Sequence, residues 1–218
     1  KPTKNNFLEI TLSTNVNQEI TEIQLPAWRP GRYELGNFAK NIQKFTVKDN
    51  NGNTLKFQKT TKDKWNVYTK DISQIVVRYN YYAIDFNAGS TYVGEDVIYV
   101  NPVNCFVYIP ERQSEPCEVE IPIEHNQKIA CGGNFENGIL KTNSFHELVD
   151  TPFIVSTKLQ SKSYQVGQTN FTVWFYGEAK PDWNIILPDF IKFTELQIQK
   201  FGDFPAENYH FINIIHLL

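Results

Sequence analysis

The sequence contains no methionine, an absence that is improbable by chance in a chain of 218 residues. It has three cysteines, Cys105, Cys117 and Cys131, but no C-x-x-C pair. Without such a pair, a zinc site built from thiolates is not expected. The odd number of cysteines and the long gaps between them favour buried free thiols, and a single disulfide is the alternative.

Several classes of protein lack their sequence signature here. The chain has no G-x-S-x-G nucleophile motif and no G-x-x-x-x-G-K-[ST] phosphate-binding loop. No apolar run approaches the ~20 residues that a membrane-spanning helix needs, so we expect no membrane partner. The net charge is −3, from 21 basic and 24 acidic residues, which argues against a nucleic-acid partner and against a polybasic membrane patch.

The N-terminus carries no recognisable signal peptide. The chain opens with Lys1 rather than methionine, so a leader could have been removed. A pI near 5.8 and unpaired cysteines favour a cytoplasmic location.

Aromatic residues are abundant at 14% of the sequence, which indicates strands and a substantial core. The length favours one large domain or two small ones. Runs that alternate apolar and polar residues predict strands over residues 7–13, 20–25, 64–68, 74–84, 96–100, 104–110, 117–123 and 170–176. Two more such runs flank Asn51 and Gly52 and predict a hairpin over residues 44–57. The strand spacing is typical of a mainly β fold, an antiparallel two-sheet sandwich.

Residues 182–205 depart from this alternation and predict a helix. Apolar residues recur there at about the spacing of one helix face, namely Ile186, Leu187, Phe190, Phe193 and Phe201. Asp189 follows Pro188 and could cap the start of the helix, whereas Gly202 would follow its last turn.

Residues 209–218 have the pattern of another strand, and the sequence stops inside it. Since a domain rarely ends in the middle of an apolar strand, we expect the natural protein to continue. The chain therefore divides into a β-rich N-terminal domain, residues 1–156, and a small α+β segment, residues 157–218.

The stretch HELVD begins at His146 like the H-E-x-x-H helix of zinc proteases. That motif places two imidazoles on one helix face, and the glutamate between them polarises a water molecule. Here the fifth residue is Asp150, and Pro152 follows two positions later, which disfavours a helix. We expect a loop or a domain junction with an exposed or hydrogen-bonded His146, rather than a metal site.

The other histidines give no stronger metal signal. His210 and His216 are six residues apart, so both would point to one side of an extended strand and could bind a metal. Two polar positions on one face of an edge strand are the favoured interpretation. The sequence therefore predicts no metal ligand and no catalytic residue within this chain.

An unusual cluster of rigid, aromatic and basic residues lies between Leu25 and Phe45. Trp28 offers an indole face, and Arg29 or Arg32 could stack on it or bind a carboxylate through two hydrogen bonds. One interpretation is a rigid corner between strands. The other is a surface that holds a partner domain or a peptide carboxylate.

Several stretches in this order resemble the glycyl aminopeptidase family, metallopeptidase family sixty-one. They are LPAWRPGRYELGNFAKNI, VVRYNYYAIDFN, YVNPVNCFVYIP, FHELVDTPF and FGDFPAENYHFINII. The first is similar to the family's proline–tryptophan–proline–glycine–tyrosine segment and is the most specific. FHELVDTPF is similar to the segment that ends the family's first domain, which would make its likeness to a zinc helix accidental.

This resemblance implies a zinc-dependent aminopeptidase that prefers small N-terminal residues such as glycine and alanine. Family members place a β-rich domain before a thermolysin-like catalytic domain. The resemblance therefore implies that residues 157–218 begin the catalytic domain, and that the full-length protein binds zinc outside this chain. Its partners would be its own downstream catalytic domain and a peptide substrate.

The resemblance also suggests where this chain could face a substrate. In the more distant aminopeptidase N group, a loop of the β domain helps to bind the substrate's free amine. By analogy, residues 87–104 could face the cleft, where Glu95 and Asp96 would suit an ammonium group. Asn101 or Asn104 could hold peptide carbonyls. Together with Arg29 and Arg32, these four residues are the predicted substrate-binding residues, and a solvated loop is the alternative.

The resemblance leads us to expect the non-catalytic N-terminal portion of a zinc aminopeptidase, inactive as a peptidase by itself. The alternative is a non-catalytic β-sandwich module that binds a carbohydrate or a protein partner. In that case exposed aromatic residues such as Trp28, Trp65 and Trp183 would form the binding platform.

Overall fold

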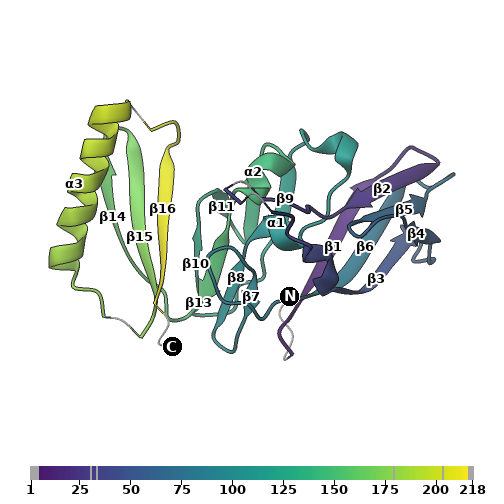
Figure 1. The fold of residues 1–218 in the computed structure, drawn as a ribbon, viewed down its shortest axis with the longest axis horizontal. Helices are drawn as coiled ribbons and strands as arrows, with labels where there is room; N and C mark the ends of the chain where they lie inside the picture. The colour runs from purple at the N-terminus through teal and green to yellow at the C-terminus, as the bar shows by residue number, and fades with distance from the viewer. Residues whose placement is uncertain (1–4, 30, 33, 179, 203, 216–218) are drawn as a thin grey trace.

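The computed structural model describes residues 5–29, 31–32, 34–178, 180–202 and 204–215 of the chain. The prediction of a mainly β chain is confirmed, and its strands form mostly antiparallel sheets (Figure 1). Within the described residues the strands form five small sheets, and the first two of these share one core, as in a two-sheet sandwich.

The N-terminal part builds two three-stranded antiparallel sheets. The first has the order β1-β6-β3 and is made of β1 (Phe7–Asn15), β6 (Gln74–Tyr82) and β3 (Ile42–Asp49). The second has the order β2-β5-β4 and is made of β2 (Ile20–Gln24), β5 (Lys64–Tyr68) and β4 (Phe57–Lys59). Alternate residues of β6 are buried, as a half-exposed strand requires, and Val77 packs with Ile23 and Val67 between the two sheets.

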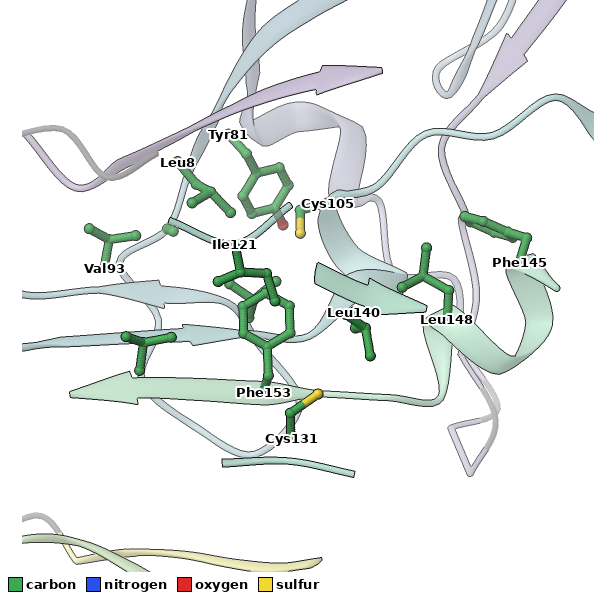
Figure 2. Packing of buried hydrophobic residues seen from close by; sticks show 13 residues of the cluster. Leu8, Tyr81, Val93, Cys105, Ile121, Cys131, Leu140, Phe145, Leu148 and Phe153 are labelled. Carbon is green, nitrogen blue, oxygen red and sulfur yellow. The ribbon is translucent and has the colours of Figure 1, made fainter. Parts of the chain in front are cut away.

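The middle part adds two more sheets and short helices. One sheet has the order β10-β13-β8-β7: β10 (Lys128–Cys131), β13 (Phe153–Ser156), β8 (Val97–Val100) and β7 (Tyr92–Val93). The other has the order β11-β12-β9: β11 (Asn134–Glu136), β12 (Ile139–Thr142) and β9 (Cys117–Glu120). The short helices are η1 (Phe38–Asn41), α1 (Pro102–Cys105), η2 (Pro110–Arg112) and α2 (Phe145–Val149). Figure 2 shows the core that these elements share, where Leu8, Ile121 and Phe153 converge.

The C-terminal part is a three-stranded sheet covered by one long helix, α3 (Trp183–Phe201) (Figure 1). The sheet has the order β14-β15-β16: β14 (Gln160–Val166), β15 (Thr169–Gly177) and β16 (Asn208–Ile215). β15 and β16 are parallel, so the chain needs a long crossover between them, and α3 supplies it. Phe190 and Ile198 on α3 pack against Phe171 and Val173 on β15.

Apolar and polar contacts join this C-terminal part to the middle sheet. Ile154 on β13 and Leu159 are fully buried in one cluster with Trp174 and Ile212 of the C-terminal sheet. Beside this cluster, the carboxylate of Asp96 accepts a hydrogen bond from the hydroxyl of Tyr176 at 3.0 Å. These contacts pack the C-terminal sheet against the β-rich part of the chain.

The structure corrects two strand predictions. Only the first arm of the predicted 44–57 hairpin is a strand. In the second arm a single bridge joins Thr54 to Lys48, and β4, which follows, pairs with β5 instead. The predicted strand over residues 104–110 begins instead in α1, which has Pro102 at its start, where proline's fixed φ suits a helix.

The predicted helix exists as α3, but its N-terminal cap and part of its packed face differ from the prediction. Asp182 rather than Asp189 caps α3, since its carboxylate accepts a hydrogen bond from the backbone N–H of Asn184, and Pro188 lies inside the helix. Gly202 ends the helix with a positive φ, as expected. Phe193 and Phe201 are exposed, because they lie outside the packed face of α3, which includes Phe190, Ile191 and Ile198. Thr194 is buried and forms a hydrogen bond with Tyr164.

None of the described helices combines the length and apolar character that crossing a membrane requires.

Candidate substrate cleft

A cleft of about 330 Å³ lies where the Arg29 segment meets α1 and the end of α2. Its lining residues are Arg29, Gly31, Arg32, Asn101, Val103, Val149 and Asp150. The cleft thus brings together three of the six predicted substrate-binding residues, Arg29, Arg32 and Asn101. We call it the arginine cleft.

Arg29 is half-buried, and its guanidinium lies directly against Gly89. A Cβ atom at residue 89 would lie 1.7 Å from Nη1 of Arg29, so any other residue there would require the guanidinium to move. Among the described residues, no side chain or carbonyl accepts a hydrogen bond from the guanidinium, and no carboxylate pairs with it. Within the described part of the chain, its N–H donors are therefore not engaged by a side chain or carbonyl.

Tyr99 lies close enough to Arg29 for the positive charge to affect the pKa of the phenol. Burial raises the pKa of the Tyr99 phenol, and the positive charge of Arg29 opposes that rise. The hydroxyl of Tyr99 donates a hydrogen bond to the carbonyl of Ala88 at 2.9 Å, which helps to hold the Gly89 loop in place.

Arg32 is more exposed than Arg29 and already has a partner. Its Nη1 lies 2.8 Å from Oε1 of Glu34, and both side chains are more than half exposed. Such an exposed pair contributes little to stability and is screened by salt. Arg32 therefore adds charge at the rim of the arginine cleft.

The two predicted asparagines have different positions. Asn101 precedes α1, lines the arginine cleft, and has its backbone N–H fixed by Oγ1 of Thr91 at 3.1 Å. Asn104 is 1% exposed, and its Nδ2 donates a hydrogen bond to the carbonyl of Gly89 at 2.8 Å. Asn104 therefore supports the loop against which Arg29 rests and is not among the residues that line the cleft.

The Oδ1 atom of Asn104 is buried and has no hydrogen-bond partner within the described part of the chain. Leaving such an atom unsatisfied costs about 1–3 kcal/mol. We infer that Asn104 is important for the conformation of the Gly89 loop, to which its Nδ2 donates a hydrogen bond.

Glu95 and Asp96 lie in the turn between β7 and β8 and do not line the arginine cleft. Both carboxylate oxygens of Asp96 have partners: Oδ2 lies 2.6 Å from Nζ of Lys158, and Oδ1 accepts from Tyr176. The hydrogen bond from Lys158 is the main cause that lowers the pKa of Asp96, and burial opposes it. Asp96 thus links the middle sheet to the C-terminal part.

The HELVD stretch forms the short helix α2, so the loop interpretation is wrong, whereas the alternative of a domain junction stays a prediction. Ser144 caps this helix, since its hydroxyl accepts from the backbone N–H of Glu147 at 3.1 Å. The Glu147 carboxylate in turn accepts from the backbone N–H of Asn143 at 2.7 Å. These two hydrogen bonds stabilise the start of a short helix, which ends at Val149, before Pro152. His146 is exposed, within the expected range, and Glu147 serves the cap.

The described residues contain no group of three or more His, Cys, Asp or Glu side chains that could hold a metal ion. His210 lies on β16, where its Nδ1 accepts a hydrogen bond from Nε1 of Trp174 at 2.9 Å, and burial lowers its pKa. His216, the other half of the predicted pair, lies outside the described residues. The residues that the structure describes therefore do not fit a zinc ion.

All three cysteines are free thiols, as favoured from the sequence. Burial raises the pKa of the Cys105 thiol to about 12, so this thiol stays protonated and unreactive at neutral pH.

The tryptophans do not form a common platform. Trp65 is 3% exposed and stacks on Phe45 in the core, whereas Trp28 is 49% exposed beside the arginine cleft. Trp183 is partly buried at the start of α3 against Phe175. The structure therefore contradicts the predicted platform.

Sequence reasoning missed Gly89 and Asp150 as parts of this region. Gly89 sits in the turn signal Asn87–Ser90, and a glycine in such a turn is a recognisable site of close backbone approach. Asp150 reaches the cleft only because α2 packs near α1, a contact that no local pattern reveals.

Comparisons with known proteins place this arrangement in context. The family model of the peptidase M61 N-terminal domain matches residues 1–157. A solved aminopeptidase N family protein from Idiomarina loihiensis is similar with a TM-score of 0.90 and 22% identity, over 96% of this chain and 37% of that one. This chain therefore spans about a third of the length of that protein. No curated protein matches the sequence.

Two further solved structures show weaker similarity. An M1 zinc metallopeptidase from Deinococcus radiodurans is 12% identical, with a TM-score of 0.48, over 94% of this chain and 51% of that one. Legionella pneumophila aminopeptidase A, in complex with aspartic acid, is 10% identical with the same TM-score, over 94% of this chain and 26% of that one.

Proposed function

This chain belongs to the M61 peptidase family, and from that membership we propose that it is the non-catalytic N-terminal portion of a zinc-dependent aminopeptidase. The full-length protein would remove small N-terminal residues, glycine or alanine, from peptides. The observation that carries this proposal is the family match, which extends over residues 1–157.

Zinc would be held by a part of the full-length protein outside this chain, since the described residues do not fit the ion. When bound, zinc supplies an activated water and polarises the peptide carbonyl. Residues 157–218 would form the first part of the catalytic domain, and the apolar cluster around Ile154 would fix their position.

The arginine cleft is the part of this chain that we assign to the substrate. The guanidinium of Arg29, which has no partner among the described residues, would bind a substrate carboxylate or carbonyl, and the amide of Asn101 would bind the peptide backbone. Arg32 would add attraction at the rim. Asn104 would keep the Gly89 loop in place, and Asp96 would hold the C-terminal part against the middle sheet.

The proposal is tested by hydrolysis of glycyl-, alanyl- and leucyl-p-nitroanilide by the full-length protein. We expect release from the glycyl and alanyl substrates at least about tenfold faster than from the leucyl substrate. A chelator should abolish the activity, and added zinc should restore it. A protein that is inactive with all three substrates, or that stays fully active after chelation, would contradict the proposal.

A further inference from the structure

A second and larger cavity, of about 600 Å³, lies between the N-terminal and middle parts of the chain. Residues 8–14 of β1 line one side of it, and residues 115–122, which include β9, line the other. Side chains from α2, β8 and β13 form its floor. We call this cavity the strand groove, because two strands run along its length.

Both strands that border the groove lie at the edge of a sheet. β1 is the outer strand of the order β1-β6-β3, β9 is the outer strand of the order β11-β12-β9, and the two are not paired with each other. Each strand therefore turns one row of backbone N–H and C=O groups toward the groove, where a further strand could bind.

The ends of the groove show how the two strands are aligned. At one end, Nη1 of Arg112 donates hydrogen bonds to Oγ1 of Thr14 at 2.8 Å and to the carbonyl of Asn15 at 2.7 Å. At the other end, Leu8 and Ile121 share one core cluster (Figure 2). β1 and β9 thus run in opposite directions, and the space between them is bounded at both ends.

We propose that the strand groove binds an extended segment of a separate polypeptide, which adds as a strand between β1 and β9. The two backbone edges would bind its main chain on both sides, as in recognition by strand addition. The inserted segment would join the two three-stranded sheets into one.

The floor of the groove determines which side chains suit every second position of the bound segment. Successive side chains of a strand point to opposite faces, so every second one would point inward. The inward positions of the bordering strands are apolar, for example Ile10 and Val119, and the floor below them includes Phe145 and Phe153. Inward side chains of the bound segment would therefore be apolar.

The rim of the groove determines which side chains suit the remaining, outward-facing positions of the bound segment. The outward side chains of β9 include Glu118 and Glu120, and both are exposed. Glu118 pairs with Lys141 at 3.3 Å, but this pair is more than half exposed and can exchange its partner at little cost. Opposite charges on neighbouring strands attract, so the outward side chains of the segment would be lysine or arginine.

The test is binding of a capped, fluorescent octapeptide that alternates lysine with valine to the full-length protein. Two companion peptides serve as controls, one with glutamate in place of lysine and one with N-methylated valines, which cannot donate main-chain hydrogen bonds. We expect the lysine peptide to bind at least about tenfold more tightly than either companion. Amide hydrogen exchange in β1 and β9 should slow when it binds.

Charge reversal on the rim supplies the matched variants. The double variant Glu118→Lys and Glu120→Lys should weaken binding of the lysine peptide about tenfold, whereas Glu124→Lys with Glu136→Lys, at exposed residues outside the groove, should not. Equal binding of the N-methylated peptide would overturn the proposal. Absence of binding by the lysine peptide would also overturn it. In that case, slow amide hydrogen exchange in β1 without any peptide would show that the protein's own chain fills the groove. The proposed peptidase activity does not depend on any of these outcomes.

Discussion

The Arg29→Gln variant of the full-length protein is expected to hydrolyse peptide substrates with a kcat/KM about 10- to 100-fold lower than the parent. Arg29 is half-buried in the arginine cleft, and no described residue accepts a hydrogen bond from its guanidinium. A hydrogen bond from a charged group to a ligand is worth about 1.5–3 kcal/mol, which corresponds to this loss. Steady-state kinetics with glycyl peptides measure it.

Two further variants separate binding by Arg29 from a general effect on the cleft. Gly89→Ala leaves the guanidinium intact but places a methyl group where Nη1 now lies, so it should reproduce part of the loss. Arg32→Gln should change kcat/KM by less than about threefold, because Arg32 is exposed and already paired with Glu34. Unchanged kinetics for both Arg29→Gln and Gly89→Ala would remove the arginine cleft from the proposed substrate site.

The Ile154→Ala variant is expected to lose about 2–5 kcal/mol of unfolding free energy, the largest stability effect that we predict. Ile154 is fully buried at the centre of β13, between Ala130 on β10 and Tyr99 on β8. Its cluster also contains residues of the C-terminal sheet, so a cavity there would loosen the contact between the two parts.

Urea denaturation followed by tryptophan fluorescence measures this loss, because Trp174 lies in the same cluster. Ile154→Val is the matched control and should cost about 0.5–1.5 kcal/mol, since it removes a single methylene group. A loss below about 1 kcal/mol for the alanine variant would show that this cluster does not hold the two parts together.

The strands that sequence could predict are those whose pattern is local. β1, β6 and β15 alternate buried and exposed residues, or carry long β-branched and aromatic runs, over nine residues each. Their existence follows from side chains that point to alternate faces of one strand. The number of sheets could not be predicted in this way, because it depends on which strands pair across long loops.

The details of α3 show a second limit. The apolar spacing predicted a helix with Phe193 on its packed face. In the structure Phe193 is exposed, and the neighbouring Thr194 is buried. A hydrogen bond with Tyr164, a residue of another element, makes this threonine suitable for burial. Pro188 lies inside the helix and is exposed, although a proline in a helix interior removes a backbone hydrogen bond.

The candidate site was predictable only in part, for a related reason. The residue types of Arg29 and Asn101 suggested binding, and both line one cleft. Glu95 and Asp96 lie in the same stretch of sequence as Asn101, but neither lines the cleft, and the Asp96 carboxylate pairs with Lys158 instead. Proximity along the chain does not determine which side chains meet in space.

The central claim is that this chain supports a peptidase whose metal is bound elsewhere, and zinc content measured by mass spectrometry tests it most directly. The full-length protein should carry about one zinc ion per chain, and its His146→Ala variant should carry the same amount. The purified 218-residue chain should carry essentially none. Stoichiometric zinc on the 218-residue chain, or loss of zinc from the His146→Ala variant, would contradict the account.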